Sequence, residues 1–238
     1  MALDPFEGIM LLLVALSAVF AAVAGLITLE GFFRNKLKQL FDDVNFFIFF
    51  FLVMGYFLYA LGEISWYLVT NFVQGFSGTG VQDIYWLAGA LLILVSFITL
   101  STHMFREHPH HRNMLALVVI GMILVISVLL IIFSTAGSEG TYVFSYIYPI
   151  LSALIVSFSS SIFFFFGELG GYGRALLFFF LASSAILLGD ILFHYTAAQE
   201  IYGIAGMMTD VFYLSGYALS GIAFIYLRLH MNTISLEE

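Results

Sequence analysis

The chain has 238 residues, of which 62% are apolar and 9% charged, with a formal net charge of −8 and a mean hydropathy of +1.07. Soluble domains are typically about 45–50% apolar and about 25% charged, so this composition predicts an integral membrane protein without a sizeable soluble domain. Seven lysines and arginines are too few for a nucleic-acid surface, and the lack of cysteine excludes disulfides, thiolate metal sites and cysteine nucleophiles.

Seven hydrophobic runs follow one another along the chain, and each is long enough to cross a hydrocarbon core of about 30 Å as a helix. They cover approximately residues 7–30, 45–72, 83–103, 114–135, 142–166, 175–197 and 210–229. Their continuity excludes a transmembrane β-barrel, whose strands would alternate apolar and polar residues in segments of about ten. We therefore expect an all-α integral membrane protein that forms a single seven-helix transmembrane domain over residues 1–238.

All the basic residues fall on one side of such a seven-helix arrangement. They are Arg34, Lys36, Lys38, Arg106, Arg112, Arg174 and Arg228. The positive-inside rule makes that side cytoplasmic, so we expect the N-terminus outside and the C-terminus in the cytoplasm. Trp66, Trp86 and several tyrosines are then expected to act as interfacial anchors.

One stretch of the chain occurs twice without a gap, because a shift of 127 positions lays residues 62–103 on residues 189–230. The pairs that carry the match are Gly62 with Gly189, Asp83 with Asp210, Gly89 with Gly216 and His103 with His230, while Glu63 falls on Asp190. Polar and glycine matches at one fixed offset indicate an internal duplication. We expect two parallel three-helix repeats, about 7–103 and about 142–230, joined by a linker helix at 114–135 and related by a pseudo-twofold axis along the membrane normal.

Glu63 is expected close to the bilayer midplane, because it lies about ten residues, or roughly 15 Å, from the outer end of the second run. Its counterpart in the sixth run is Asp190. A carboxylate at that depth costs about 2.5–3.5 kcal/mol, so it should face the bundle and be partnered or protonated. Either the pair forms a proton, cation or polar-ligand site, or neutral acids hydrogen-bond nearby serines or tyrosines and lock helices together. If both face the pseudo-twofold axis, at least one should be protonated at neutral pH.

His194 follows Asp190 by four residues, which places both side chains on one helical face about one turn apart. This spacing suits a metal ion or a proton relay. The candidate metal ligands are Asp190, His194 and Glu63, with Asp83, Asp210 and Glu200 as further candidates. The alternative is a histidine that only forms a hydrogen bond, and the first repeat has Tyr67 at the equivalent place.

Asp83 and Asp210 are expected to open the third and seventh helices at the outer boundary. A carboxylate there can cap free N–H groups and meet the positive end of the helix dipole. The alternative is that both form the rim of a vestibule above the deeper acids. The candidate ligand- or ion-binding residues are therefore Glu63, Asp83, Asp190, His194 and Asp210.

Other polar residues suggest structural roles. We expect the following to lie in loops or at helix ends: the tract His108, His110 and His111, the glycines Gly170, Gly171 and Gly173, and the repeat-related His103 and His230. Small residues in the fifth run should let helices approach and bond one another. They are Ser157, Ser159, Ser160 and Ser161, for which no paired base suggests a nucleophile.

Four short segments carry a resemblance to a known family. GDILFHY and TDVFYLSGYAL, at residues 189–195 and 209–219, resemble the last two helices of multi-pass membrane sensor modules found at the N-termini of some prokaryotic diguanylate cyclases and histidine kinases. GEISWYL and QDIYWLAGALL, at residues 62–68 and 82–92, are similar to an earlier helix pair of those modules. The resemblance implies a sensor. No cyclase or kinase domain follows Glu238, so we expect a free-standing module that signals through a separate partner, or another role.

Two better-known seven-helix families fit less well. Microbial rhodopsins are similar in helix number and in having an aspartate in the last helix, but they attach retinal to a lysine there, and residues 210–229 contain none. A retinal Schiff base is therefore excluded. SWEET sugar transporters are similar in their three-plus-one-plus-three layout. Their characteristic helix prolines are missing here, because the whole chain contains only three prolines.

The sequence thus favours a non-enzymatic sensor or receptor in the cell membrane that binds a small polar or cationic ligand at an outward-facing acidic site. The alternatives are a proton-coupled or cation transporter that uses the same carboxylates, and a metal-dependent intramembrane hydrolase. Expected partners are the lipid bilayer, the ligand, and a cytoplasmic signalling protein or further copies of the chain, but not nucleic acid. No cofactor is expected, although a metal ion remains an alternative.

Overall fold

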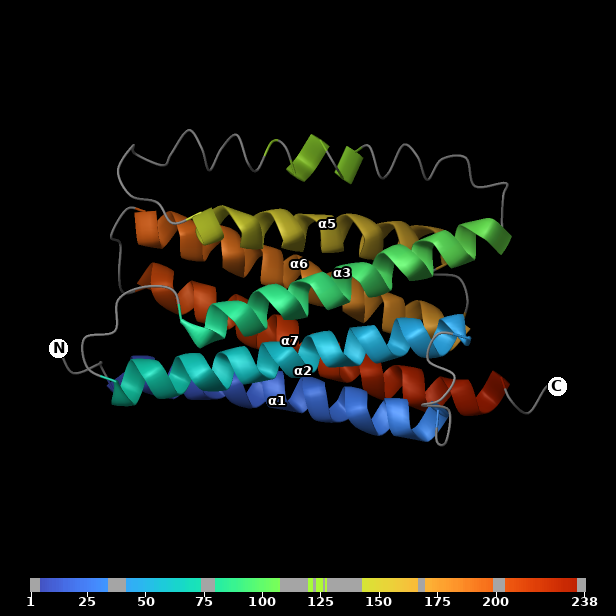
Figure 1. Cartoon of the computed structure of the whole chain (residues 1–238), viewed down its shortest axis with the longest axis horizontal. Helices are drawn as coiled ribbons and strands as arrows, with labels where there is room; N and C mark the ends of the chain where they lie inside the picture. The colour runs from blue at the N-terminus through green and yellow to red at the C-terminus, as the bar shows by residue number, and fades with distance from the viewer. Residues whose placement is uncertain are drawn as a thin grey trace.

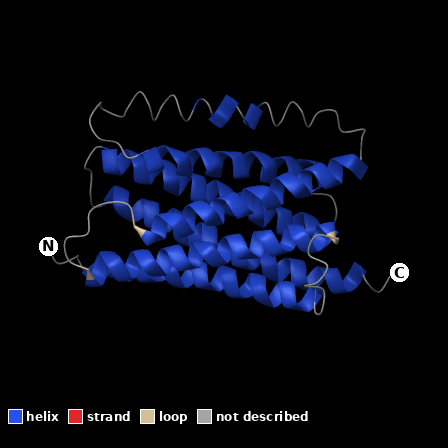
Figure 2. Cartoon of the chain, in the orientation of Figure 1, coloured by secondary structure: helices blue, strands red, loops and turns tan. Residues whose placement is uncertain are grey.

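The computed structural model is built from long helices that lie side by side (Figure 1). Its continuous helices are α1 (Pro5–Phe33), α2 (Val44–Phe72), α3 (Val81–Glu107), α5 (Val143–Phe166), α6 (Gly170–Ala198) and α7 (Ile204–Ile234). The structure describes residues 5–33, 42–73, 80–107, 143–166, 170–198 and 204–234, together with positions 120, 121, 123–125 and 127, which are also helical. Figure 2 shows only helix and short loop pieces in this described part.

Six of these helices are long and apolar enough to cross a membrane, which confirms a polytopic all-α membrane protein. The candidate spans are Phe6–Phe32, Val44–Phe72, Val81–Met104, Ile147–Phe164, Gly173–Thr196 and Gly206–His230. The fourth predicted run, residues 114–135, lies outside the described residues except for the helical positions between 120 and 127.

Several helices extend beyond the apolar runs, which corrects some of the sequence-based boundaries. α6 begins at Gly170, so the three glycines of its first turns are helical and do not form a separate turn. α7 begins at Ile204, so Asp210 lies in its second turn and does not open it. His103 and His230 likewise lie inside helices. Hydropathy marks only the membrane-embedded part, whereas backbone hydrogen bonds continue the helix into more polar sequence.

The six continuous helices form a closed ring in which each packs mainly against two neighbours. Around the ring, α1 packs on α2, α2 on α3, α3 on α5, α5 on α6, α6 on α7 and α7 on α1. α1 and α7 run in one direction and α2 and α6 in the other, so the two termini lie at opposite ends of the molecule (Figure 1). In this order α1, α2 and α3 each lie three places from α5, α6 and α7, respectively.

Two glycines allow α2 and α3 to approach each other closely. A Cβ atom added to Gly89 would lie 2.8 Å from the carbonyl oxygen of Gly55, and one added to Gly55 would lie 2.9 Å from the carbonyl oxygen of Gly89. Without a hydrophobic force between helices in lipid, such small residues provide the van der Waals contact. The two backbones can therefore keep this distance only while both positions lack a side chain.

Buried aromatic side chains fill the inside of the bundle beyond Glu63, on the side where Tyr56 lies. Phe179 of α6 lies 6.2 Å from Phe97 of α3 and 5.1 Å from Phe224 of α7, measured between ring centroids. The Tyr56 ring lies 5.6 Å from that of Phe224. All four residues are almost completely buried. This aromatic cluster, Tyr56, Phe97, Phe179 and Phe224, joins four helices.

Serine and threonine side chains add hydrogen bonds between neighbouring helices. Ser96 of α3 donates to the Ile48 carbonyl of α2 at 2.8 Å, and Thr28 of α1 lies 3.1 Å from the Phe224 carbonyl of α7. The hydroxyls of Ser159 and Ser183 are 2.8 Å apart and connect α5 with α6. Ser159 therefore bonds a neighbouring helix, as the serine-rich stretch predicted.

We expect Gly89→Ala to destabilise the bundle, because the new methyl group would collide with backbone and not with a movable side-chain tip. Overpacking of this kind typically costs about 1–3 kcal/mol. Thermal unfolding in detergent should show a lower midpoint. Gly206→Ala in α7 is the matched control, since nothing lies within 4 Å of its Cβ position and helix propensity favours alanine. Equal midpoints for the two variants would contradict the close approach.

Candidate functional site

Glu63 lies in the middle of the bundle with only 6% of its surface exposed. Its Oε1 atom accepts two hydrogen bonds, one from the indole nitrogen of Trp86 on α3 at 3.1 Å and one from the hydroxyl of Tyr217 on α7 at 2.7 Å. Among the described residues, none forms a hydrogen bond with the second oxygen, Oε2. Glu63 thus joins three helices and keeps one acceptor atom for a further donor.

Asp190 is the buried carboxylate of α6, with 9% of its surface exposed. The hydroxyl of Tyr213 on α7 donates to Oδ1 at 2.7 Å, and the hydroxyl of Ser152 on α5 donates to Oδ2 at 2.5 Å. Each oxygen of Asp190 therefore has its own donor. Hydrogen bonds to a charged acceptor contribute more than neutral ones, and leaving such a group unpaired in the interior is costly.

The two carboxylates use donors at corresponding places in the sequence. Trp86 follows Glu63 by 23 residues, and Tyr213 follows Asp190 by the same separation. A glycine precedes each acid and makes room for the donor ring: a Cβ atom at Gly62 would lie 2.5 Å from Trp86, and one at Gly189 would lie 2.9 Å from Tyr213. The offset of 127 residues thus relates an acid, a glycine and an aromatic donor in each half.

Aromatic rings surround the Glu63 carboxylate. The Tyr59 ring lies 5.9 Å from that of Tyr217, and the Trp86 ring lies 6.0 Å from Trp66 and 6.4 Å from Tyr148. These distances are typical of aromatic pairs in contact. Trp86 and Tyr217 direct their polar edges at the carboxylate, and the other rings pack against these two, so aromatic side chains from several helices lie near the acid.

Asp83 and Asp210 lie on the same side of the deeper acids but in different surroundings. The Oδ2 atom of Asp83 accepts from the backbone nitrogen of Gly80 at 2.8 Å, which ties the residue before α3 to the first turn of that helix. Its Oδ1 accepts from the hydroxyl of Tyr148 at 3.0 Å. Asp210 is partly buried within electrostatic range of Glu7 on α1 and of Glu63.

Glu63 therefore lies within electrostatic range of both Asp210 and Asp190. Asp83 instead has hydrogen-bond partners at the helix start and on α5. The other predicted site residue, His194, is buried one turn beyond Asp190 on α6.

A metal site is not assembled by the part of the chain that the structure describes. Within those residues, no three histidine or carboxylate side chains gather closely enough to hold one ion. His194 packs its ring at 6.5 Å from that of Phe193. Glu200 and the tract from His108 to His111 lie outside the described residues. The metal ligands suggested by the sequence thus remain a prediction that this geometry does not favour.

The donors to the two acids were not identified from the sequence. Trp86 was expected to anchor at the interface, but its indole N–H is directed at the buried Glu63. The offset of 127 residues could have indicated Trp86 and Tyr213, because both follow their acid at the same distance. Tyr217 and Ser152 give no such signal, since they lie 154 and 38 residues from the acids that they bond.

No protein-family model matches this chain, no curated protein is significantly similar to it in sequence, and no solved structure matches it significantly. Functional inference therefore rests on the geometry of the site.

Replacing Glu63 with leucine should destabilise the protein, because the Trp86 N–H and the Tyr217 hydroxyl would both lose their acceptor. A buried donor left unsatisfied costs about 1–3 kcal/mol. Glu63→Gln is the matched control, since its amide oxygen can still accept both bonds and the loss of stability should be smaller. The measurement is thermal unfolding in detergent. An equally large loss in both variants would show that charge, and not hydrogen bonding, is what the fold requires.

Proposed function

We propose that this polytopic membrane protein is a sensor or receptor module that binds a small cationic ligand at the site formed by Glu63 and Asp190. The observation that carries the proposal is the unused acceptor of a buried acid, Glu63 Oε2, beside a group of aromatic rings. A ligand with N–H groups would provide the missing hydrogen bond and a compensating positive charge. Acidic residues inside a membrane domain commonly serve such sites.

The aromatic rings favour a cation over a neutral polar ligand. A cation over the face of tryptophan or tyrosine gains about 0.5–2 kcal/mol, with the larger values where the site is desolvated. Trp86 and Tyr217 bond the Glu63 carboxyl group, and the Tyr59 and Tyr148 rings pack against them, so aromatic rings lie close to the acid. The combination of a carboxylate with π faces suits an ammonium or guanidinium group, which both elements attract.

We propose that the ligand enters from the end of the bundle that carries Asp83 and Asp210. On the opposite side of the acids, the aromatic cluster of Tyr56, Phe97, Phe179 and Phe224 is buried and closely packed. A receptor needs access from one side only, whereas a transporter needs a route to the other side and two access states. The closed cluster therefore supports a receptor over a cation transporter.

The proposed orientation and duplication agree with this direction of entry. Arg106, Arg174 and Arg228 are exposed at the end of α3, the start of α6 and the last turns of α7, away from the acid-bearing end. We assign that end to the cytoplasm by the positive-inside rule. The order of helices around the ring and the matching acid–donor pairs support two repeats related by a pseudo-twofold axis. A signal would then pass to a separate cytoplasmic partner.

Trp86 provides a direct reporter of ligand binding, because the sequence contains only two tryptophans. In a Trp66→Phe protein, guanidinium chloride added far below denaturing concentrations should change the Trp86 emission in a saturable manner. Adding Glu63→Gln should abolish this response, because the amide carries no charge. Sodium chloride at equal ionic strength controls for screening, and acetamide tests a neutral donor. Saturation by acetamide without a response to guanidinium would contradict a cationic ligand.

Flux measurements separate the receptor from the transporter. Proteoliposomes should bind labelled guanidinium in proportion to the protein present but should not accumulate it, because the aromatic cluster closes the bundle below the acids. Protein-free liposomes give the background. Accumulation that disappears in Glu63→Gln or Asp190→Asn would contradict the receptor proposal and would establish transport through the same carboxylates.

A further inference from the structure

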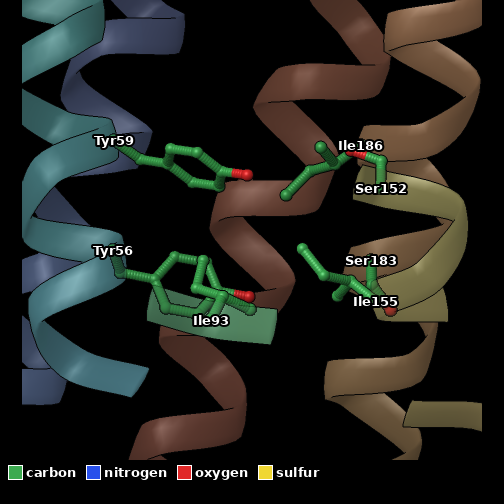
Figure 3. Close-up of a pocket in the computed structure, with 7 residues that line it drawn as sticks. All are labelled: Tyr56, Tyr59, Ile93, Ser152, Ile155, Ser183 and Ile186. Atoms are coloured by element: carbon green, nitrogen blue, oxygen red, sulfur yellow. The ribbon is translucent and has the colours of Figure 1, made fainter. Parts of the chain in front are cut away.

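A small cavity lies between α2, α3, α5 and α6 (Figure 3), and one of its lining residues, Ser152, bonds Asp190. Its lining residues are Tyr56, Tyr59, Ile93, Ser152, Ile155, Ser183 and Ile186. The cavity has space for about one water molecule, so it is too small for the ligand discussed above. It combines an apolar wall of three isoleucines with four hydroxyl groups.

Tyr59 gives this cavity an unsatisfied donor. The residue is 6% exposed, and its hydroxyl points from α2 toward the side of the cavity lined by Ser152 and Ile186 (Figure 3). Among the described residues, none forms a hydrogen bond with that hydroxyl. A buried hydroxyl without a partner is expensive, and although most of this cavity wall is apolar, a water molecule there could pair the Tyr59 hydroxyl with Ser152.

Ser152 and Ser183 can accept hydrogen bonds in the same cavity. The Ser152 hydroxyl donates its proton to Asp190 Oδ2, which leaves its oxygen lone pairs available. The Ser183 hydroxyl lies 2.9 Å from the Phe179 carbonyl and 2.8 Å from Ser159, and its oxygen retains capacity to accept. Figure 3 shows Ser183 near Tyr56, at the other end of the cavity from Tyr59. A water molecule that accepts from Tyr59 and donates to Ser152 would make two hydrogen bonds, within the range of two to four found for buried water.

We propose that this cavity is a binding site for one water molecule, which connects Tyr59 on α2 through Ser152 to the Asp190 carboxylate on α6. Tyr59 and Glu63 are four residues apart on α2 and therefore lie on one face. Through this water, the face of α2 that carries Tyr59 and Glu63 is hydrogen-bonded to Ser152 and, through Ser152, to Asp190. This link depends on the cavity and its hydroxyls, and it holds whether or not a cationic ligand binds at Glu63.

A crystal structure or cryo-EM map that resolves ordered waters tests the site directly. We expect a single density peak within hydrogen-bonding distance of the Tyr59 and Ser152 oxygens. Tyr59→Phe should remove the peak. Tyr148→Phe is the control, because it deletes a tyrosine hydroxyl that bonds Asp83 and does not line the cavity, and the peak should remain. A peak that persists in Tyr59→Phe, or is missing from the wild type, would overturn the assignment.

The sign of the stability change in Tyr59→Phe gives a second, independent test. If water satisfies the hydroxyl, its deletion removes hydrogen bonds and should lower the unfolding midpoint by a few degrees. If the cavity is dry, deletion relieves an unsatisfied polar group, and the midpoint should rise. Tyrosine to phenylalanine changes shape very little, so both proteins are expected to fold. A higher midpoint than wild type would refute the proposal.

Discussion

The fold depends on the need to supply hydrogen-bond donors to two carboxyl groups in a medium that contains almost no water. Lipid offers no partner, so each acid must find its donors on neighbouring helices. Glu63 of α2 takes them from α3 and α7, and Asp190 of α6 takes them from α7 and α5. These four bonds fix the rotation of five helices around their axes, because a modest turn of any one would leave a buried donor or acceptor unpaired.

Close packing and polar bonding are coupled in this arrangement. The donor rings of Trp86 and Tyr213 reach their acids only because Gly62 and Gly189 carry no side chain where each ring lies. A side chain at either glycine would displace the ring and therefore weaken the hydrogen bond. The helix pairs α2–α3 and α6–α7 hence obtain van der Waals contact and acid–donor geometry from the same positions, which also gives the proposed duplication a physical reason to retain them.

The sequence predicted the parts of this design that depend on local pattern. Continuous apolar runs located six described spans, and the cost of a carboxylate in lipid identified Glu63 and Asp190 as buried residues. The donors Tyr217 and Ser152 could not be predicted in this way. Tyrosine and serine are frequent in membrane helices, and their role here depends on which distant helices become neighbours. Helix ends were also misplaced, since hydropathy does not record where a helix continues into polar surroundings.

The two halves differ in how completely each acid is satisfied, and this difference determines where a ligand can act. Asp190 has one donor on each oxygen, so a further donor would have to share an occupied atom. Glu63 has both donors on Oε1, which leaves Oε2 as the acceptor for an incoming group. In the proposed receptor, Glu63 makes the first hydrogen bond to the ligand, and Asp190 holds α5, α6 and α7 together beside it.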